Sequence, residues 1–292
     1  INLNPIYLLS ASFDSQYSAY SRYAYIENTS FIKNSFKNKY NEYASNGIGF
    51  NIYESYETFQ GFIHNCSFID NYGPIAKAKT INSSIFINNE LASITALSVN
   101  NSYFERNTNL VQNGNSYVGN GIVTANVVIN STFIMNKAAY GGALYNPKIV
   151  HYSAFVNNSA KYNGNDIFTY SGDVDYSSNW WGDNQKPDSR KIFIFLGTLT
   201  MDDWIVMTLE NITQNVVKAS LNTLVDDSQN TYPLNHIINS RPVFFSSQIG
   251  SITPANTTLI NNAAYANIIQ NGSSDDFNVF ARIDNQILDL TI

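Results

Sequence analysis

The feature that most constrains the fold is a short motif that returns along the first two thirds of the chain. It reads Ser, Thr or Cys, any residue, Phe, two further residues, Asn. The clear copies are Phe31–Asn34, Phe68–Asn71, Phe86–Asn89, Phe104–Asn107, Phe133–Asn136 and Phe155–Asn158. With Phe50 as a degenerate copy and Tyr176–Asn179 as a last copy, successive aromatic residues lie 18 to 29 positions apart. Helix-pair repeats need about 33 residues or more, so this period excludes them.

A period near 20 residues fits one coil of a right-handed parallel β-helix of the pectate-lyase-like kind. Each coil stacks on the next at about 4.8 Å, which places Phe over Phe in an internal aromatic row. We expect the Asn to adopt left-handed turn geometry and to bond its amide to the neighbouring coil. The alternative is a platform of rings for binding sugars. Regularity favours the core, because an internal stack needs the same residue in every coil.

The repeat is interrupted where the coils become longer. About ten extra residues separate Phe104 from Phe133, and the Gly- and Asn-rich segment 113–121 predicts a protruding loop there. Gly141-Gly142 and Gly164 follow the next two copies, and they predict tight corners before the following strands.

The repeat stops at Asn179-Trp180-Trp181-Gly182. An open stack exposes edges and core, so we expect the two tryptophans to cap it. The polar segment 183–190 predicts a linker, and seven short strand-like segments follow it. They are Trp204–Leu209, Val216–Leu221, Pro242–Phe245, Thr257–Ile260, Ala263–Ile269, Phe277–Ile283 and Ile287–Ile292. The sequence therefore predicts a β-helix over 1–190 and an Ig-like β-sandwich over 191–292.

Composition excludes several classes of protein. A net charge of −6 argues against a nucleic-acid partner, which a basic surface would favour. The single cysteine, Cys66, has no partner for an internal disulfide, and we expect it to pack as a small residue of the repeat. There is no apolar run of about 20 residues, so we expect no direct contact with a membrane.

Catalysis on a β-helix requires carboxylates gathered on one face, to bind Ca²⁺ or to act as an acid and base about 5–9 Å apart. At equal offsets from the repeated Phe, no two neighbouring coils carry acidic residues. His64 and His151 share an offset, but four coils, or about 19 Å, separate them. We therefore predict no catalytic residue, no metal and no cofactor. A polysaccharide lyase or hydrolase remains the alternative.

The candidates for ligand contact stand outside the repeat offsets, since Tyr offers a flat amphipathic ring suited to glycans and proteins. We predict contacts from Tyr20, Tyr23, Tyr25, Asn113, Asn115, Tyr117 and Asn120, with Tyr40 and Tyr43 as further exposed rings. Packing under loops is the alternative role for these tyrosines. Glycosylation sequons occur at Asn28, Asn65, Asn82, Asn100, Asn130, Asn157, Asn211, Asn256 and Asn271, although the repeat itself produces several of them.

Four segments carry a resemblance to known proteins. Gly141-Gly142-Ala143-Leu144-Tyr145-Asn146 and Asn179-Trp180-Trp181-Gly182 resemble the large adhesin-like proteins of methanogenic archaea, and more distantly the polymorphic outer-membrane adhesins. The C-terminal part is similar to the bacterial Ig-like domains of invasin and intimin, through Val243–Ser246 and Gly250–Pro254.

The resemblance implies a non-enzymatic cell-surface adhesin that attaches to other cells, host surfaces or glycans. We expect an extracellular, monomeric fragment of a larger surface protein whose anchor lies elsewhere, with the surface of another cell, protein or glycan, as its partner. A purely structural surface spacer is the third hypothesis.

Overall fold

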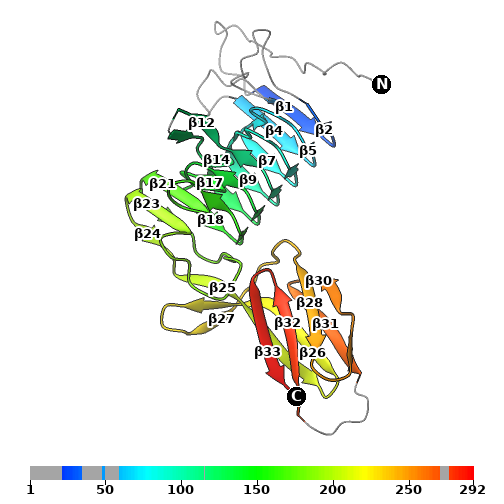
Figure 1. Cartoon of the computed structure of the whole chain (residues 1–292). Helices are drawn as coiled ribbons and strands as arrows, with labels where there is room; N and C mark the ends of the chain where they lie inside the picture. Colours follow the sequence, from blue (N-terminus) through cyan, green and yellow to red (C-terminus); the bar gives the residue numbers. More distant parts are fainter. Residues whose placement is uncertain (1–21, 35–47, 50–58, 115, 270–275) are drawn as a thin grey trace, which may run out of the picture.

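The computed structural model describes residues 22–34, 48–49, 59–114, 116–269 and 276–292 (Figure 1). These residues form strands and turns, and no helix occurs among them. None of them therefore forms a helix that is long and apolar enough to cross a bilayer. Strands up to Thr200 pair in parallel apart from one short hairpin, and later strands pair antiparallel. The predicted all-β class is confirmed, and most strands lie in parallel sheets.

The first part of the chain, called the parallel part, winds through three parallel sheets. The largest contains β1 (Arg22–Glu27), β3 (Ile48–Gly49), β4 (Phe59–His64), β6 (Ala76–Lys77), β7 (Thr80–Asn82), β9 (Ile94–Asn100), β14 (Val123–Ile129), β17 (Leu144–Tyr145), β18 (Ile149–His151), β21 (Ile167–Ser171), β22 (Val174–Asp175), β23 (Ile192–Leu196) and β24 (Leu199–Thr200). The second contains β2 (Ser30–Ile32), β5 (Ser67–Ile69), β8 (Ile85–Ile87), β10 (Tyr103–Glu105), β15 (Thr132–Ile134) and β19 (Ala154–Val156). The third contains β11 (Thr108–Asn109), β16 (Lys137–Ala138) and β20 (Ser159–Ala160).

The repeated Phe residues pair with one another across the second sheet, as predicted. Their rings stack at centroid separations of 4.6 to 5.2 Å from Phe31 to Phe155. Phe68, Phe86 and Phe104 are completely buried. The repeat therefore builds the core, and its rings are not available to a ligand.

The repeated Asn residues form a second buried row beside the rings. Asn107 Oδ1 accepts hydrogen bonds from the backbone N–H and the side-chain amide of Asn89, at 3.1 and 2.8 Å. Asn107 Nδ2 donates to Asn136 Oδ1 at 3.0 Å and to the carbonyl of Phe86 at 2.9 Å. The amide is thus fully satisfied, and the same pattern continues from Asn34 to Asn158.

The predicted left-handed geometry of these Asn residues is wrong by one position. The positive φ angle belongs to the residue before each of them, for example Asp70, Arg106 and Met135, with φ between 51 and 55°. The buried Asn has no positive φ, because its side chain bonds along the stack while the preceding residue makes the turn. Nonglycine residues tolerate this strain here because stacking on both sides fixes the turn.

Two predicted copies of the repeat have different outcomes. Phe31 pairs and stacks directly with Phe68 in the second sheet, and Phe50 lies outside the described residues. At the other end, Trp181 stacks on Phe155 at 4.9 Å in place of Tyr176. Asn179 Oδ1 accepts from the N–H of Ser153 at 2.8 Å, and therefore takes the role of the repeated serine.

The predicted glycine corners are confirmed. Gly141 and Gly164 have φ angles of 61 and 68°. A Cβ atom at Gly141 would lie 2.0 Å from the carbonyl oxygen of Leu144, and one at Gly142 would lie 2.2 Å from that of Asn165. Only glycine fits this close approach of stacked backbones.

Parallel pairing continues beyond residue 190, where the sequence predicts the domain boundary. β23 pairs with β21, and β24 pairs with β22. The last part, called the antiparallel part, begins after Thr200. It contains β25 (Asp203–Thr213), β26 (Val216–Asp226), β27 (Thr231–Pro233), β29 (Ser251–Thr253) and β31 (Ala263–Ile269) in one sheet, and β28 (Pro242–Ser247), β30 (Asn256–Thr258), β32 (Asn278–Ile283) and β33 (Gln286–Thr291) in another.

The two adjacent tryptophans belong to different cores. Trp181 joins the core of the parallel part, whereas Trp180 packs in the antiparallel core with Ile205, Val217 and Ile283. Both indoles are almost completely buried. Side chains on either side of a single peptide bond therefore enter two different cores.

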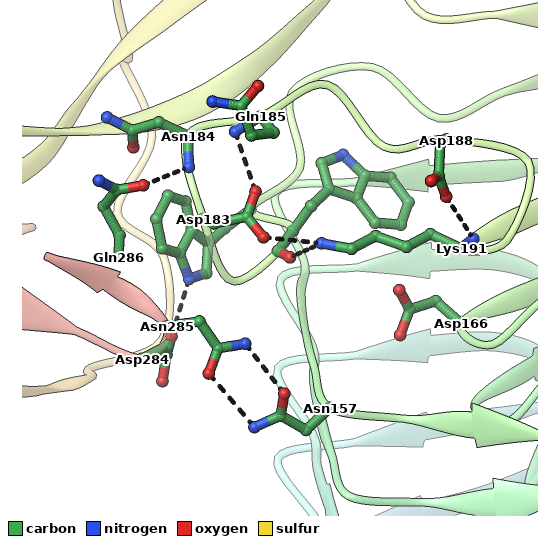
Figure 2. Close-up of polar contacts among 12 residues, drawn as sticks. Asn157, Asp166, Asp183, Asn184, Gln185, Asp188, Lys191, Asp284, Asn285 and Gln286 are labelled. Carbon is green, nitrogen blue, oxygen red and sulfur yellow. Dashed lines mark hydrogen bonds and ion pairs between the residues drawn. The ribbon is translucent and has the colours of Figure 1, made fainter.

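Polar contacts fasten the junction between the two parts (Figure 2). Trp180 Nε1 donates to Asp284 Oδ2 at 2.7 Å, and Arg241 forms an ion pair with the same carboxylate. Arg241 and Asp284 are only 3 and 7 % exposed. Asn157 and Asn285 exchange amide hydrogen bonds across the junction. The junction is thus held by side chains far apart in the sequence.

The predicted linker 183–190 contributes to this junction. The backbone N–H of Asn184 donates to Gln286 Oε1 at 2.9 Å, and Asn184 Oδ1 accepts from the N–H of Met207 at 2.6 Å. Lys191 Nζ donates to the carbonyl of Trp181 at 2.5 Å and lies 3.2 Å from Asp183. Figure 2 shows these side chains converging between the two parts.

Candidate functional site

The extra residues of the long coil form an antiparallel hairpin rather than an irregular loop. β12 (Val111–Asn113) pairs with β13 (Ser116–Val118), and Gln112 lies opposite Tyr117. At the base of the hairpin, Asn109 Nδ2 donates to the carbonyls of Asn120 and Gly121 at 3.0 and 2.9 Å. The hairpin emerges from the side of the parallel part (Figure 1).

Glycine is required where the hairpin returns to the stack. Gly119 has a φ angle of 129°, and a Cβ atom there would lie 1.9 Å from the carbonyl oxygen of Asn109. Gly121 has a φ of 37°, and its Cβ would lie 2.8 Å from the backbone nitrogen of Tyr145. These glycines and Asn109 fix the hairpin against the stack, so its orientation is set by close backbone packing.

Aromatic and basic side chains gather beneath the hairpin. The backbone N–H of Tyr117 donates to the hydroxyl of Tyr162 at 2.9 Å, and Lys161 Nζ lies 5.0 Å from the centre of the Tyr117 ring. The rings of Tyr140 and Tyr162 lie 4.9 Å apart. We call Tyr117, Tyr140, Lys161 and Tyr162 the hairpin platform. It offers partly exposed rings, hydroxyls and one cation to a ligand.

The other predicted contact residues do not join this platform. Asn113 and Asn120 are exposed on the hairpin and at its base. Tyr25 is 58 % exposed and stacks on Phe62 at 5.0 Å, but it lies on β1, the first strand of the largest sheet. The backbone of Tyr23 is also in β1. The remaining predictions, Tyr20, Tyr40, Tyr43 and Asn115, lie outside the described residues.

Sequence reasoning missed Tyr140, Lys161 and Tyr162. A signal for them exists, because Tyr140 and Tyr162 stand at the same offset after Phe133 and Phe155. Equal offsets in adjacent coils place side chains over one another. The two tyrosines are therefore a partial repeat, confined to the coils that lie beside the hairpin.

The sequons occupy several environments. Asn65 and Asn130 donate their amides to Asn28 and Asn101 in an outer row, at 2.6 and 2.8 Å. Asn82 contacts His64, and Asn157 is bonded to Asn285. Asn100 is half-buried, and Asn211 and Asn256 are exposed in the antiparallel part. Asn271 lies outside the described residues.

The two histidines are separated as predicted. Strand register connects His64 to Asn82, Asn100, Ile129 and then His151, which is four steps. His64 Nδ1 lies 3.2 Å from Asn82 Nδ2, and His151 Nε2 lies 3.0 Å from Asp175. Each imidazole has its own partner. Across the described ranges, no group of three or more His, Cys, Asp or Glu side chains is placed to hold a metal ion.

Cys66 takes the place of the repeated serine. Its backbone N–H donates to Ser84 Oγ at 3.1 Å, and its thiol donates to the carbonyl of His64 at 3.2 Å. Burial raises the pKa of this thiol. The buried and protonated thiol acts as a packed member of the row, and a reactive nucleophile requires the opposite shift.

A buried carboxyl group ends the Asn row. Asp166 Oδ1 accepts from Asn158 Nδ2 at 3.0 Å where the next Asn would otherwise stand. Burial raises the pKa of Asp166 to about 7, while Asn158 and Lys191 oppose this shift. The sequence shows no sign of this group, because Asp166 lies outside the repeat offsets.

Comparison with protein-family models, curated proteins and solved structures found no match.

Proposed function

We propose that this protein is a cell-surface adhesin fragment, in which a right-handed parallel β-helix and an Ig-like sandwich display a binding hairpin. The regular Phe and Asn rows support the β-helix. Two antiparallel sheets around one core support the sandwich. The adhesin-like kinship with methanogenic archaeal proteins is part of this proposal, and rests on the segments 141–146 and 179–182.

The observation that carries the proposal is the hairpin platform. It stands at the long coil that interrupts the repeat, and Tyr117 is held there by contacts with Tyr162 and Lys161. Fixed aromatic rings lose little conformational entropy on binding, and they form the energetic centre of many interfaces. The proposed partner is a protein or glycan on the surface of another cell, and the proposed location is extracellular.

Binding without turnover is the proposed activity. The buried Asp166 is 3 % exposed and bonded to Asn158, which suits a structural role better than proton transfer to a substrate. Glycans are proposed for the exposed sequons at Asn211 and Asn256. The amides of Asn65 and Asn157 are engaged by neighbouring side chains, which makes them poorer acceptors.

Binding of fluorescently labelled chain to a glycan array and to candidate partner cells tests this function. We expect Tyr117→Ala to weaken binding about tenfold, which corresponds to about 1.4 kcal/mol. Tyr265→Ala is the matched control, since Tyr265 is 54 % exposed in the antiparallel part, and we expect it to bind as the wild type does.

Each competing hypothesis has its own result in the same experiment. Unsaturated sugar product in an assay with acidic polysaccharide and Ca²⁺ would overturn binding without turnover and support a lyase. Failure to bind any cell or glycan would favour a structural spacer. Equal loss of binding in Tyr117→Ala and Tyr265→Ala would remove the hairpin platform from the proposal.

A further inference from the structure

The largest sheet ends in a strand with an open edge. β23 pairs with β21 on one side, and it has no second partner strand among the residues that the structure describes. Among the described residues, β24 pairs with β22 alone. Figure 1 shows both strands at the outer end of the parallel part, beside the start of the antiparallel part. The junction therefore covers the Phe row at Trp181 but leaves this edge without a strand.

The open edge carries aromatic rings whose rows stop there. Phe193 stacks on Phe168 at 5.6 Å, and Phe195 stacks on Tyr170 at 5.3 Å. Phe195 and Leu196 are each 56 % exposed, and Leu199 is 41 % exposed. Rings inside the parallel part have a neighbour on both faces, whereas Phe193 and Phe195 stack on one earlier ring each.

The usual protection of an edge strand is missing from β23. Its sequence, Ile-Phe-Ile-Phe-Leu, contains no charge, no Pro and no Gly, and Gly197 to Thr200 that follow are uncharged. Natural edge strands avoid pairing through charges, prolines, bulges or a covering element. An uncharged edge with exposed apolar side chains indicates that another strand covers it.

We propose that β23 pairs antiparallel with β23 of a second copy of the chain, about a twofold axis at Ile194. The sequence of β23 is nearly palindromic about Ile194, so two antiparallel copies place aromatic residues opposite aromatic residues and aliphatic residues opposite aliphatic residues. Phe193 then faces Phe195 of the second copy, and Ile192 faces Leu196. The two aromatic pairs lie on one face, because alternate residues of a strand share a face.

The symmetry of β23 selects a second copy over a strand from a different protein. A twofold interface uses the same patch on both subunits, so its residues must be complementary to themselves. An unrelated partner strand would impose no such symmetry on positions 192–196. The assembly differs from the monomer expected from the sequence, and it goes beyond the proposed binding function because it does not involve the hairpin platform.

Sedimentation equilibrium of the full chain over about 1 to 200 µM tests the assembly. We expect a monomer–dimer equilibrium, and Phe195→Lys to raise the dimer dissociation constant at least about tenfold by placing two charges in the apolar pairs. Tyr265→Lys is the control, since Tyr265 is as exposed but lies on β31, which is paired on both sides. We expect it to dimerise as the wild type does. Circular dichroism checks that both variants fold.

Cross-linking tests the register. In a Cys66→Ser background, Ile194→Cys places each new thiol opposite itself on the axis, at a Cα separation of about 5.5 Å that a disulfide spans. Leu199→Cys lies off the axis and serves as the control. We expect oxidation to link Ile194→Cys and to leave Leu199→Cys monomeric. A wild-type chain that stays monomeric at the highest concentration, or equal cross-linking of the two variants, would overturn the proposal.

Discussion

The parallel and antiparallel parts of this chain build their cores by different means. In the parallel part, identical side chains stack and bond along the axis, as Asn89, Asn107 and Asn136 do. In the antiparallel part, strands such as β31 and β32 alternate buried and exposed residues, with no repeated identity. The first part therefore depends on which residue stands at each rung, whereas the second depends mainly on the pattern of apolar and polar residues.

The junction between the two parts depends neither on a repeated residue nor on an alternating apolar and polar pattern. Trp180 and Trp181 enter different cores, and Asp284 receives hydrogen bonds from both Trp180 and Arg241. These contacts join single residues up to 104 positions apart. The coupling of the two parts is thus concentrated in a few side chains, and single substitutions can test it.

The largest effect is expected for Asp284→Ala, which separates the two parts energetically. It leaves the Arg241 guanidinium buried without its carboxylate, at a cost of about 3–5 kcal/mol. We expect the antiparallel part of the variant to unfold first. Calorimetry should then show two separate unfolding transitions, which begin at a lower temperature than unfolding of the wild type, whose two parts unfold more nearly together. Asp289→Ala, at an exposed position of β33, is the control and should leave the trace unchanged. A single transition shifted without splitting would contradict the idea of a concentrated junction.

The next effect is expected for Asn107→Ala, which breaks the inner Asn row at its centre. The variant removes four hydrogen bonds and leaves the amides of Asn89 and Asn136 incompletely paired in the core. We expect the free energy of unfolding to fall by about 3 kcal/mol in urea titrations. Asn101→Ala removes an exposed amide of the outer row and should cost less than about 1 kcal/mol. Equal losses of unfolding free energy in the two variants would show that the buried Asn row contributes no more to stability than the exposed one.

A smaller effect is expected for Asp166→Asn, and it depends on pH. The pKa of about 7 in the folded state lies above the ordinary value of 3.8, so the native state binds this proton more tightly. The contribution of Asp166 to the free energy of unfolding should therefore be largest below about pH 4 and decrease as the pH rises to about 7. Asp166→Asn should flatten this slope, because an amide continues the row at every pH.

Urea titrations at several pH values between about 4 and 8 measure this slope. Asp70→Asn replaces an exposed carboxyl of the same part and should keep the slope, since Asp166 remains. A slope of unchanged size in Asp166→Asn would assign the pH dependence to other groups.

The parallel part was largely predictable because stacking of the coils requires the same residue type at the same offset in each coil. That rule locates both inner rows and the long coil at the hairpin. It fails where a single residue imitates the repeat. Tyr176 stands three residues before Asn179, as each repeated Phe stands before its Asn, but Trp181 takes the stacking position on Phe155.

The candidate site was predictable only in part. Tyr117 lies in a visible interruption of the repeat, and Tyr140 and Tyr162 share an offset, so a search for partial repeats would find them. The contact between Lys161 and Tyr117 depends on how the hairpin folds back, which no local pattern encodes. The junction is less predictable still, because Arg241 and Asp284 occur once each and their pairing is set by tertiary packing.

The smallest effect is expected for Cys66→Ser. This change makes residue 66 match the serines that the repeat places at the same offset, Ser84, Ser102, Ser131 and Ser153. Ser84 Oγ donates to the carbonyl of Asn82 at 2.9 Å, and a serine at 66 has the equivalent carbonyl of His64 within reach. We expect a change in unfolding free energy within about 1 kcal/mol, because a small hydrogen-bonding side chain is retained. Ser102→Ala is the informative contrast, since it deprives the N–H of Ser84 of its acceptor and should cost about 1–2 kcal/mol. If Cys66→Ser instead cost more than Ser102→Ala, the thiol would have a role that the serine row does not explain.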